Sequence, residues 1–368
     1  MKFLASTTVK REFHGVLGLA ALLFITACNS SPQDKPDTQF SKIDAKASQL
    51  TFVNQIQEKE NFNYFIHTGF YNGAGVAAGD INNDGLVDLY FCGNQVNDAL
   101  YLNTGDLTFQ DISVESNIQS NTGWSSGVTM VDINSDGYLD IYVCRYLSSH
   151  ANESTQNLLY INNHDNTFIE EGQKYGIADK GNSVHATFFD YDLDGDLDLY
   201  VLNQPTGYRS LKQKERETDP DRASDRMYRN NGDRSFTDIT LEAGMINYGY
   251  GLGVVVGDID KNGYPDLLVA NDYDTPDFVY LNTGENNFIR VEDIVFKHMS
   301  NFSMGMDLAD INNDDGLDVF VVDMLAKDHY RQKVNMGAMN EEKFWAMVDS
   351  GRHYQYMRNV LQLNNNNG

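Results

Sequence analysis

The sequence is poor in cysteine and in basic side chains. Three cysteines, Cys28, Cys92 and Cys144, among 368 residues are too few for a disulfide framework. With 27 basic against 53 acidic residues, the formal net charge is −26, and such a chain is not expected to neutralise the phosphates of a nucleic acid. The eight histidines lack metal-ligand spacing, and neither Gly-x-Ser-x-Gly nor His-Glu-x-x-His occurs. These absences favour a protein that is not an enzyme.

Long hydrophobic runs are also missing. The apolar run Val16–Ile25 is too short to span a bilayer but has the length of the apolar region of a signal peptide. It leads into Ile-Thr-Ala-Cys28, which resembles a bacterial lipobox. We therefore expect residues 1–27 to be a signal peptide, Cys28 to be lipidated and residues 28–48 to form a polar tether; an uncleaved anchor is the alternative. Asn29 gives no reason for retention at the inner membrane, so we expect an outer-membrane lipoprotein of a bacterial envelope, at the cell surface or on the periplasmic face.

What the chain has in abundance is one nine-residue motif, Asp-x-Asn/Asp-x-Asp/Asn-Gly-x-x-Asp. Oxygen-bearing side chains at its positions 1, 3, 5 and 9, arranged around a glycine turn, are what a hard cation such as Ca²⁺ needs. The copies contain 18 of the 53 acidic residues, so much of the acidity is explained as ligand. The motif occurs five times, beginning at Asp80, Asp132, Asp190, Asp258 and Asp310.

Short apolar, β-branched and aromatic segments precede and follow every copy, so the motif is predicted to be the turn between two strands. This placement excludes an EF-hand, which needs flanking helices and a Glu at position 12. Position 12 is apolar in every copy: Phe91, Val143, Val201, Val269 and Val321.

Two further strands are predicted after each motif, and a unit of four strands is typical of a propeller blade. The third strand carries Leu-Tyr-x-Asn or a close variant, and the fourth begins at Phe109, Phe168, Phe236 or Phe288. We therefore predict an all-β fold, a β-propeller with five visible blades over residues 49–368. Thr51–Val53 resembles a lone fourth strand, and the segment from Val360 resembles a third-strand hairpin. Either the first segment closes a five-bladed ring, or the chain is truncated at its C-terminus, which we favour.

Two insertions interrupt the repeats, residues 204–226 and residues 325–357, and the second contains a predicted helix from Asn340 to Val348. Long loops of this kind often carry function, although a solvated or packing excursion is the simpler interpretation. Cys92 and Cys144 occupy equivalent positions after the first two motifs and are expected to be small buried apolar residues.

The repeats resemble a known family. The run from Gly73 to Asp80 and the run from Gly251 to Asp258 look like the FG-GAP or VCBS repeat of integrin α-type β-propellers. The segment from Leu100 to Asp111 is similar to bacterial surface proteins of the ASPIC and UnbV group, which are related to cartilage acidic protein. The resemblance implies a seven-bladed propeller that continues beyond the present sequence.

The resemblance also implies a ligand scheme, with side chains at positions 1, 3, 5 and 9 and the carbonyl oxygen of position 7. The fifth repeat departs from the pattern, because Gly316 stands at position 7 and Asp315 takes the turn position. The expected metal ligands are Asp80, Asn82, Asp84, Leu86, Asp88, Asp132, Asn134, Asp136, Tyr138, Asp140, Asp190, Asp192, Asp194, Asp196, Asp198, Asp258, Asp260, Asn262, Tyr264, Asp266, Asp310, Asn312, Asp314, Gly316 and Asp318.

The family implies binding rather than turnover. We expect a calcium-stabilised, lipid-anchored envelope module, with about one Ca²⁺ per repeat and up to five in all, that binds a glycan or a protein partner and touches the membrane only through its N-terminal lipid. The alternatives are a calcium-assisted polysaccharide lyase or hydrolase on the same scaffold, and a purely structural envelope component.

Overall fold

The computed structural model describes residues 40–118, 123–146, 156–205, 223–273, 275–335 and 340–366. The chain divides into two compact units, Met1–Ala47 and Ser48–Gly368. Only residues 40–47 of the first unit are described, and there Asp44 Oδ1 accepts the main-chain N–H groups of Lys46 and Ala47. The expected signal peptide, Cys28 and most of the expected tether lie outside the described residues. Within the described part of the chain, no helix is long and apolar enough to cross a membrane.

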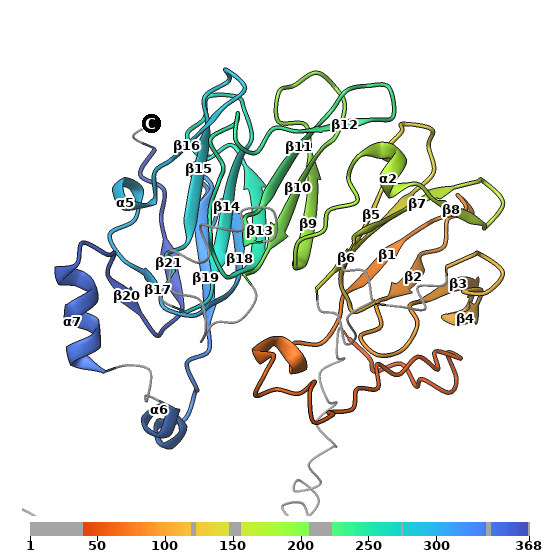
Figure 1. Cartoon of the computed structure of the whole chain (residues 1–368), viewed down its shortest axis with the longest axis horizontal. Coiled ribbons are helices and arrows are strands. Elements are labelled where there is room, and N and C mark those ends of the chain that lie inside the picture. The colour runs from red at the N-terminus through yellow and green to blue at the C-terminus, as the bar shows by residue number, and fades with distance from the viewer. Residues whose placement is uncertain are drawn as a thin grey trace, which may run out of the picture. The chain divides into compact units, whose positions relative to one another are not determined.

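The second unit is built from consecutive antiparallel sheets, which we call sheets 1 to 5 (Figure 1). Sheet 1 contains β1 (Val76–Gly79), β2 (Asp88–Phe91), β3 (Ala99–Gly105) and β4 (Thr108–Asp111). Sheet 2 contains β5 (Ser125–Val131), β6 (Asp140–Arg145), β7 (Leu158–Asn162) and β8 (Phe168–Glu170). Sheet 3 contains β9 (Ser183–Phe189), β10 (Asp198–Asn203), β11 (Arg226–Asn230) and β12 (Phe236–Asp238). Sheet 4 contains β13 (Gly251–Gly257), β14 (Asp266–Asn271), β15 (Phe278–Asn282) and β16 (Phe288–Arg290). Sheet 5 contains β18 (Ser303–Ala309), β19 (Asp318–Asp323) and β21 (Val360–Gln362).

Each sheet is a simple meander in which neighbours in sequence pair with each other, and the predicted strands on both sides of every motif are confirmed. A two-stranded parallel pair joins distant segments of the chain, β17 (Met299–Ser300) and β20 (Gln355–Tyr356). The helical segments are short: η1 (Thr68–Tyr71), α2 (Gly172–Tyr175), α5 (Glu292–Val295), α6 (His329–Asn335) and α7 (Glu341–Asp349).

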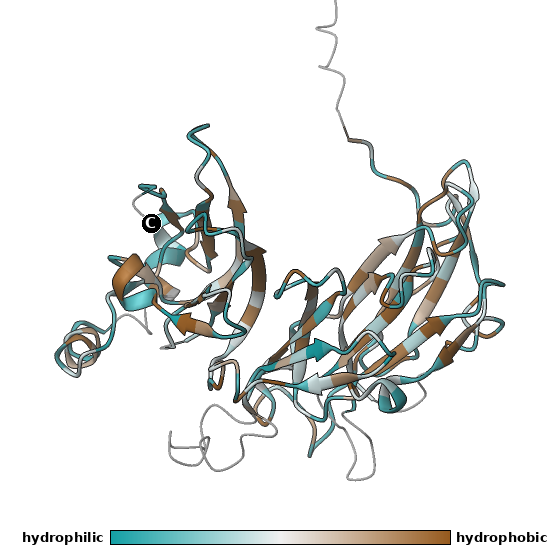
Figure 2. Ribbon diagram, turned by 90° about the horizontal axis from the view of Figure 1, so that it is seen from above, coloured by the Kyte–Doolittle hydropathy of each residue, from teal (hydrophilic) through white to brown (hydrophobic). Residues whose placement is uncertain are grey.

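The hydrophobic core consists of layers between successive sheets, and Figure 2 shows apolar residues concentrated along the strands. One cluster joins sheets 1 and 2, and others join sheets 2 and 3, sheets 3 and 4, and sheets 4 and 5. The first strands β1, β5, β9, β13 and β18 lie next to one another in that order. Four-stranded antiparallel sheets that stack through their faces in chain order are the blades of a β-propeller, and the predicted fold class is confirmed.

The stacking can be followed at one position of the second strand. Tyr90, Tyr142, Tyr200 and Leu268 are all fully buried there, whereas Phe320 in sheet 5 is 40% exposed. In sheets 1 to 4, the following sheet packs over this position and buries it. Among the described residues no sheet packs over Phe320, so the stacking ends at sheet 5.

The prediction of a fourth strand at Thr51–Val53 is wrong, because these residues form no strand. The carbonyl oxygen of Ser48 accepts the N–H of Phe109, just as Ser116 accepts that of Phe168. Gln49 has a positive φ of 61°, matching 62° at Asn117. Ser48 and Gln49 are therefore equivalent to Ser116 and Asn117, in the turn that follows a fourth strand. Phe52 mimics a strand residue because its ring stacks on Phe91 and covers sheet 1.

Three smaller predictions are confirmed. The segment at Val360 is the third strand of sheet 5, paired with β19. The helix expected near Asn340–Val348 is α7, and Oδ1 of Asn340 accepts the N–H groups of Glu342 and Lys343 at its start. Cys92 and Cys144 are free thiols and are buried. Most of the first insertion, residues 206–222, lies outside the described residues.

Candidate metal loops

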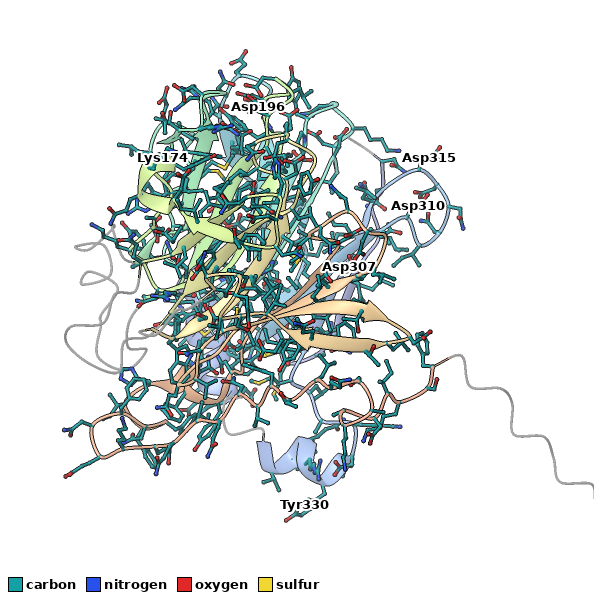
Figure 3. All side chains as sticks on the ribbon, turned by 90° about the vertical axis from the view of Figure 1, so that its right-hand side faces the viewer. Lys174, Asp196, Asp307, Asp310, Asp315 and Tyr330 are labelled. Atoms are coloured by element: carbon teal, nitrogen blue, oxygen red, sulfur yellow. The ribbon has the colours of Figure 1, made fainter. Side chains whose placement is uncertain are left out.

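Each motif forms the turn between the first and second strands of one sheet. We call these turns loop 1 (residues 80–88), loop 2 (132–140), loop 3 (190–198), loop 4 (258–266) and loop 5 (310–318). Figure 3 labels Asp196 in loop 3 and Asp310 and Asp315 in loop 5. Position 9 is the first residue of the second strand in every sheet, and its side chain is buried.

The first seven positions of every loop fold through the same hydrogen bonds. In loop 1, the N–H of Asp84 donates to Asp80 Oδ1 over 3.2 Å, and that of Gly85 donates to Asp80 Oδ2 over 2.8 Å. The N–H of Leu86 donates to Asp84 Oδ1 over 2.8 Å. The same three bonds recur in loops 2, 3, 4 and 5. Side-chain oxygens at positions 1 and 5 therefore lie on the inside of one turn, next to the backbone of position 7. In loops 1, 2, 4 and 5, Oδ1 at position 3 accepts the N–H of position 5 as well.

Position 9 is held differently, because its carboxylate is buried under the loop. In loop 3, Asp198 Oδ2 accepts the N–H of Tyr191 over 3.0 Å, and Oδ1 accepts the N–H of Asn230 over 2.8 Å. Equivalent pairs of bonds hold Asp88, Asp140, Asp266 and Asp318. Each carboxylate oxygen has two lone pairs, so both oxygens keep one for a cation.

Burial also sets the charge of this group. It raises the pKa of Asp140 and of Asp198 to about 7, and that of Asp266 to about 6. Main-chain N–H donors oppose this shift, while the neighbouring aspartates of the same loop add to it. A buried carboxylate beside other carboxylates stays ionised most easily when a cation shares the site.

In loop 3 and in loop 4, three carboxylate oxygens of the same loop lie close enough together to bind one ion. Carboxylate oxygens of Asp190, Asp192 and Asp198 lie within 4.8 Å of one another, as do those of Asp258, Asp260 and Asp266. Oδ1 of Asp192 is buried and, among the described residues, accepts no hydrogen bond. An unpaired buried carboxylate oxygen is costly unless a ligand satisfies it. Aspartates of this arrangement could hold a metal ion, and the residues present fit a hard cation.

The irregular fifth loop keeps the geometry of the others. Asp315 at position 6 has φ of 67°, the left-handed conformation that Gly85 adopts with φ of 85°. Position 4 is left-handed as well, for example φ of 60° at Leu193, although the sequence places no glycine there. The displaced Gly316 therefore changes the strain of the loop rather than its hydrogen bonds.

Loop 2 has a feature that the sequence did not suggest. The ring of His164, at the tip of the following hairpin, stacks on Tyr138 with centroids 4.1 Å apart. Its Nε2 lies 3.0 Å from Oδ2 of Asp136. The equivalent residue is Gly105, Gly232 or Gly284 in the repeats of loops 1, 3 and 4, so this contact distinguishes loop 2 from those loops.

A second recurring polar residue was not predicted from the sequence. It accepts a main-chain N–H at the opposite end of the second strand. Asn157, just before β7, accepts the N–H of Arg145 over 2.8 Å and donates through Nδ2 to Ser183 of the next sheet over 2.8 Å. An Asp or Asn accepts the same main-chain bond in every sheet. The residues are Asp98, Asn157, Asp225, Asp277 and Asn359. The signal was an Asp or Asn three residues before the tyrosine of the third strand, at four of the five positions.

Comparison with known families agrees with this repeat structure. The family model described as FG-GAP-like repeat matches residues 80–143, 147–201, 218–269 and 258–321, more than half of the chain. The chain belongs to the FG-GAP-like repeat family. Four matched FG-GAP-like segments span all five loops.

Curated relatives point to the second resemblance noted in the sequence. The FG-GAP-like chain is 23% identical to cartilage acidic protein 1 of Xenopus tropicalis over 72% of its own length and 41% of the relative. It is 26% identical to cartilage acidic protein 1 of Homo sapiens over 55% of its length and 28% of the relative. The chain thus spans less than half of the length of these relatives.

Among solved structures, one similar chain is an Agrocybe aegerita lectin solved for its recognition of non-reducing terminal N-acetylglucosamine. Its TM-score is 0.39 at 16% identity, covering 74% of this chain and 72% of the lectin. The V. cholerae biofilm matrix protein Bap1 gives a TM-score of 0.33 at 13% identity, covering 64% of this chain and 30% of that one.

Proposed function

We propose that loops 1 to 5 bind Ca²⁺ and that the ions stabilise the propeller. The converging oxygens at positions 1, 3, 5 and 9, with the carbonyl oxygen of position 7, suit the oxygen-only coordination that Ca²⁺ prefers. The bound ion would supply positive charge where carboxylates crowd together and would tie the turn to the buried start of the second strand. Support comes from the gathered aspartates of loops 3 and 4 and the unpaired oxygen of Asp192.

We further propose that this scaffold is a binding or adhesion module of the bacterial cell envelope, tethered through a lipid on Cys28. The repeated polar residues are engaged in holding loops and sheets together, so recognition of a glycan or protein partner falls to the segments that do not repeat. Two such segments expose large apolar side chains, the turn before sheet 1 and the insertion carrying α6 and α7. The exposed residues are Tyr64, Phe65, Ile66, Tyr71, Tyr330, Val334 and Trp345.

The observation that carries this proposal is how the turn before sheet 1 is built. Oδ1 of Asn63 accepts the N–H groups of Phe65 and Ile66, and its Nδ2 donates to the carbonyl oxygens of Lys59 and Glu60. These bonds hold Phe65 outward with 91% of its surface exposed. Exposed aromatic side chains held by a rigid scaffold are characteristic of binding surfaces.

The base of this turn is firmly packed. Phe62 and Phe70 are buried against Trp124. The exposed side chains therefore sit on a fixed support and would lose little conformational freedom when a partner binds.

The proposal is tested with the purified chain on a glycan array and in binding measurements with envelope proteins, in Ca²⁺ and in EDTA. Tyr64→Ser with Phe65→Ser should weaken binding at least about tenfold with no change in Tm, because exposed side chains contribute little to folding. Thr108→Ser, at the start of β4, is the control. Absence of any ligand, or Ca²⁺-dependent degradation of a polysaccharide, would contradict the binding function and favour the structural or the enzymatic alternative.

A further inference from the structure

In three of the four pairs of neighbouring loops, the side chain of a recurring asparagine joins one loop to the next. This asparagine lies at or near the end of the third strand of each sheet, as Asn103, Asn162, Asn230, Asn282 and Asn364. Its main-chain N–H donates to the position 9 aspartate of its own loop over 2.8 Å in every repeat. Its Nδ2 donates to the carbonyl oxygen of the residue before that aspartate.

In three repeats the same Nδ2 also reaches the preceding loop. Asn282 donates to the carbonyl oxygen of Tyr191 in loop 3 over 2.8 Å. The N–H of Tyr191 in turn donates to Asp198. An unbroken relay of three hydrogen bonds therefore runs from Asp266 of loop 4 to Asp198 of loop 3.

The same contact joins loop 5 to loop 4 and loop 2 to loop 1. Asn364 donates to Ile259 of loop 4 over 2.8 Å, which extends the chain of bonds from loop 5 to loop 3. Asn162 donates to Ile81 of loop 1 over 2.8 Å, which links loop 2 to loop 1. A second bond joins the same two loops, from Asn83 Nδ2 to the carbonyl oxygen of Gly137 over 2.9 Å.

Loops 2 and 3 are the exception. Asn230 keeps the bonds within its own repeat, to Asp198, Leu197 and Gly232. Among the described residues, no hydrogen bond joins Asn230 to Ile133, its expected partner in loop 2. The relay is thus interrupted at one interface out of four.

We propose that Ca²⁺ binding is coupled in two blocks, loops 1 and 2 together and loops 3, 4 and 5 together, through Asn162, Asn282 and Asn364. The inference rests on the calcium-binding function proposed above. An ion that fixes the position 9 aspartate of one loop also fixes the asparagine bonded to it, and through Nδ2 it fixes the backbone between ligand positions 1 and 3 of the neighbouring loop. The neighbour then orders less backbone when its own ion binds, which is positive coupling.

The sign of the effect separates this relay from simple electrostatics. A variant that empties a loop loses one Ca²⁺ and two carboxylates together, so charge alone would leave binding at the next loop nearly unchanged. The relay predicts weaker binding beside an empty loop.

Hydrogen exchange of each loop, followed by mass spectrometry against Ca²⁺ concentration, tests the proposal on the full chain. Asp258→Ala with Asp260→Ala removes two ligand side chains, which empties loop 4 and leaves Asp266 and the relay in place. We expect the protection midpoints of loops 3 and 5 to rise at least about fivefold in Ca²⁺ concentration, with loops 1 and 2 unchanged. Emptying loop 2 with Asp132→Ala and Asp136→Ala should shift loop 1 but leave loop 3 unchanged.

Asn282→Ala removes Nδ2 but keeps the main-chain N–H on Asp266. In this background, emptying loop 4 should no longer move the midpoint of loop 3. Asn230→Ala is the matched control, since it loses the same bonds within its repeat but none to another loop, and it should leave the coupling intact. If the emptied chain does not fold, Asn282→Ala alone decides, because it should widen the separation between the midpoints of loops 3 and 4 relative to the natural chain.

Unchanged midpoints beside an emptied loop, or equal coupling between loops 2 and 3, would overturn the relay while leaving calcium binding intact. Absence of Ca²⁺-dependent protection in every loop would overturn the proposed calcium function, and the coupling with it.

Discussion

The main-chain N–H of Asn230 donates to Oδ1 of Asp198 over 2.8 Å, and this bond has the same length in all five repeats. Asp198 also accepts the N–H of Tyr191, so one carboxylate links the turn between the first and second strands to the end of the third strand. The position 9 aspartate therefore has a structural role before any ion is considered.

Replacing Asp198 with alanine should destabilise the metal-free protein by about 3 kcal/mol, because two main-chain N–H groups lose their buried acceptor. Asp194→Ala is the control from the same loop, since Asp194 is exposed, and in EDTA it should cost less than about 1 kcal/mol. Urea unfolding in EDTA measures both variants. Equal losses would show that position 9 acts only as a metal ligand.

The polar residue at the other end of the second strand makes a comparable contribution. Asn157 is completely buried and bonds to Arg145, Tyr142 and Ser183. Asn157→Ala should reduce the free energy of unfolding by about 2–4 kcal/mol, whereas Asn163→Ala, at an exposed position nearby, should change it by less than about 0.5 kcal/mol. In the presence of Ca²⁺, Asn157→Ala should again lose more stability than Asn163→Ala. If Asn157→Ala left the free energy of unfolding unchanged, Asn157 would not stabilise the contact between sheets.

The metal-free protein should lose stability as the pH rises. Burial raises the pKa of Asp225 to about 6 and that of Asp277 to about 7, from an ordinary value of 3.8. Between about pH 4 and pH 7 the folded protein holds protons that the unfolded chain has released, so raising the pH favours unfolding, by more than about 1 kcal/mol for each group. Urea midpoints in EDTA should be lower at pH 8 than at pH 5.

Asp225→Asn supplies the matched test of this pH dependence. Asn157 already occupies the equivalent position in sheet 2, so an amide is compatible with the site. The variant should make the loss of stability between the two pH values smaller. A natural chain that becomes more stable from pH 5 to pH 8 in EDTA would contradict the assignment.

The sequence allowed prediction of those features that depend on neighbours along the chain. Strand limits followed from apolar runs around each motif, and the turn at Asp310 was recognised even though Gly316 is displaced. Asn340 was placed at the start of its helix for the same local reason. The converging oxygens at positions 1, 3 and 5 belong to one turn of five residues, which the motif specifies by itself.

The features that could not be predicted depend on residues far apart in sequence. Asn282 and Tyr191 are separated by 91 positions, yet they form the bond that joins two loops. Thr51–Val53 was predicted as a strand because it matches the sequence pattern of a fourth strand. In the structure Phe52 stacks on Phe91, but the segment pairs with no strand. The strands β17 and β20 pair across an insertion, and neither two-residue sequence has a pattern that predicts this pairing.

The central claim is that calcium bound in five inter-strand turns stabilises the propeller, and thermal unfolding in Ca²⁺ and in EDTA tests it most directly. A tenfold excess of Ca²⁺ over Kd contributes about 1.4 kcal/mol per site, on the order of 7 kcal/mol for five sites. We predict a Tm at least about 5 °C higher in Ca²⁺ than in EDTA, a rise that an equal concentration of Mg²⁺ does not reproduce. An identical Tm in Ca²⁺ and in EDTA would contradict the claim.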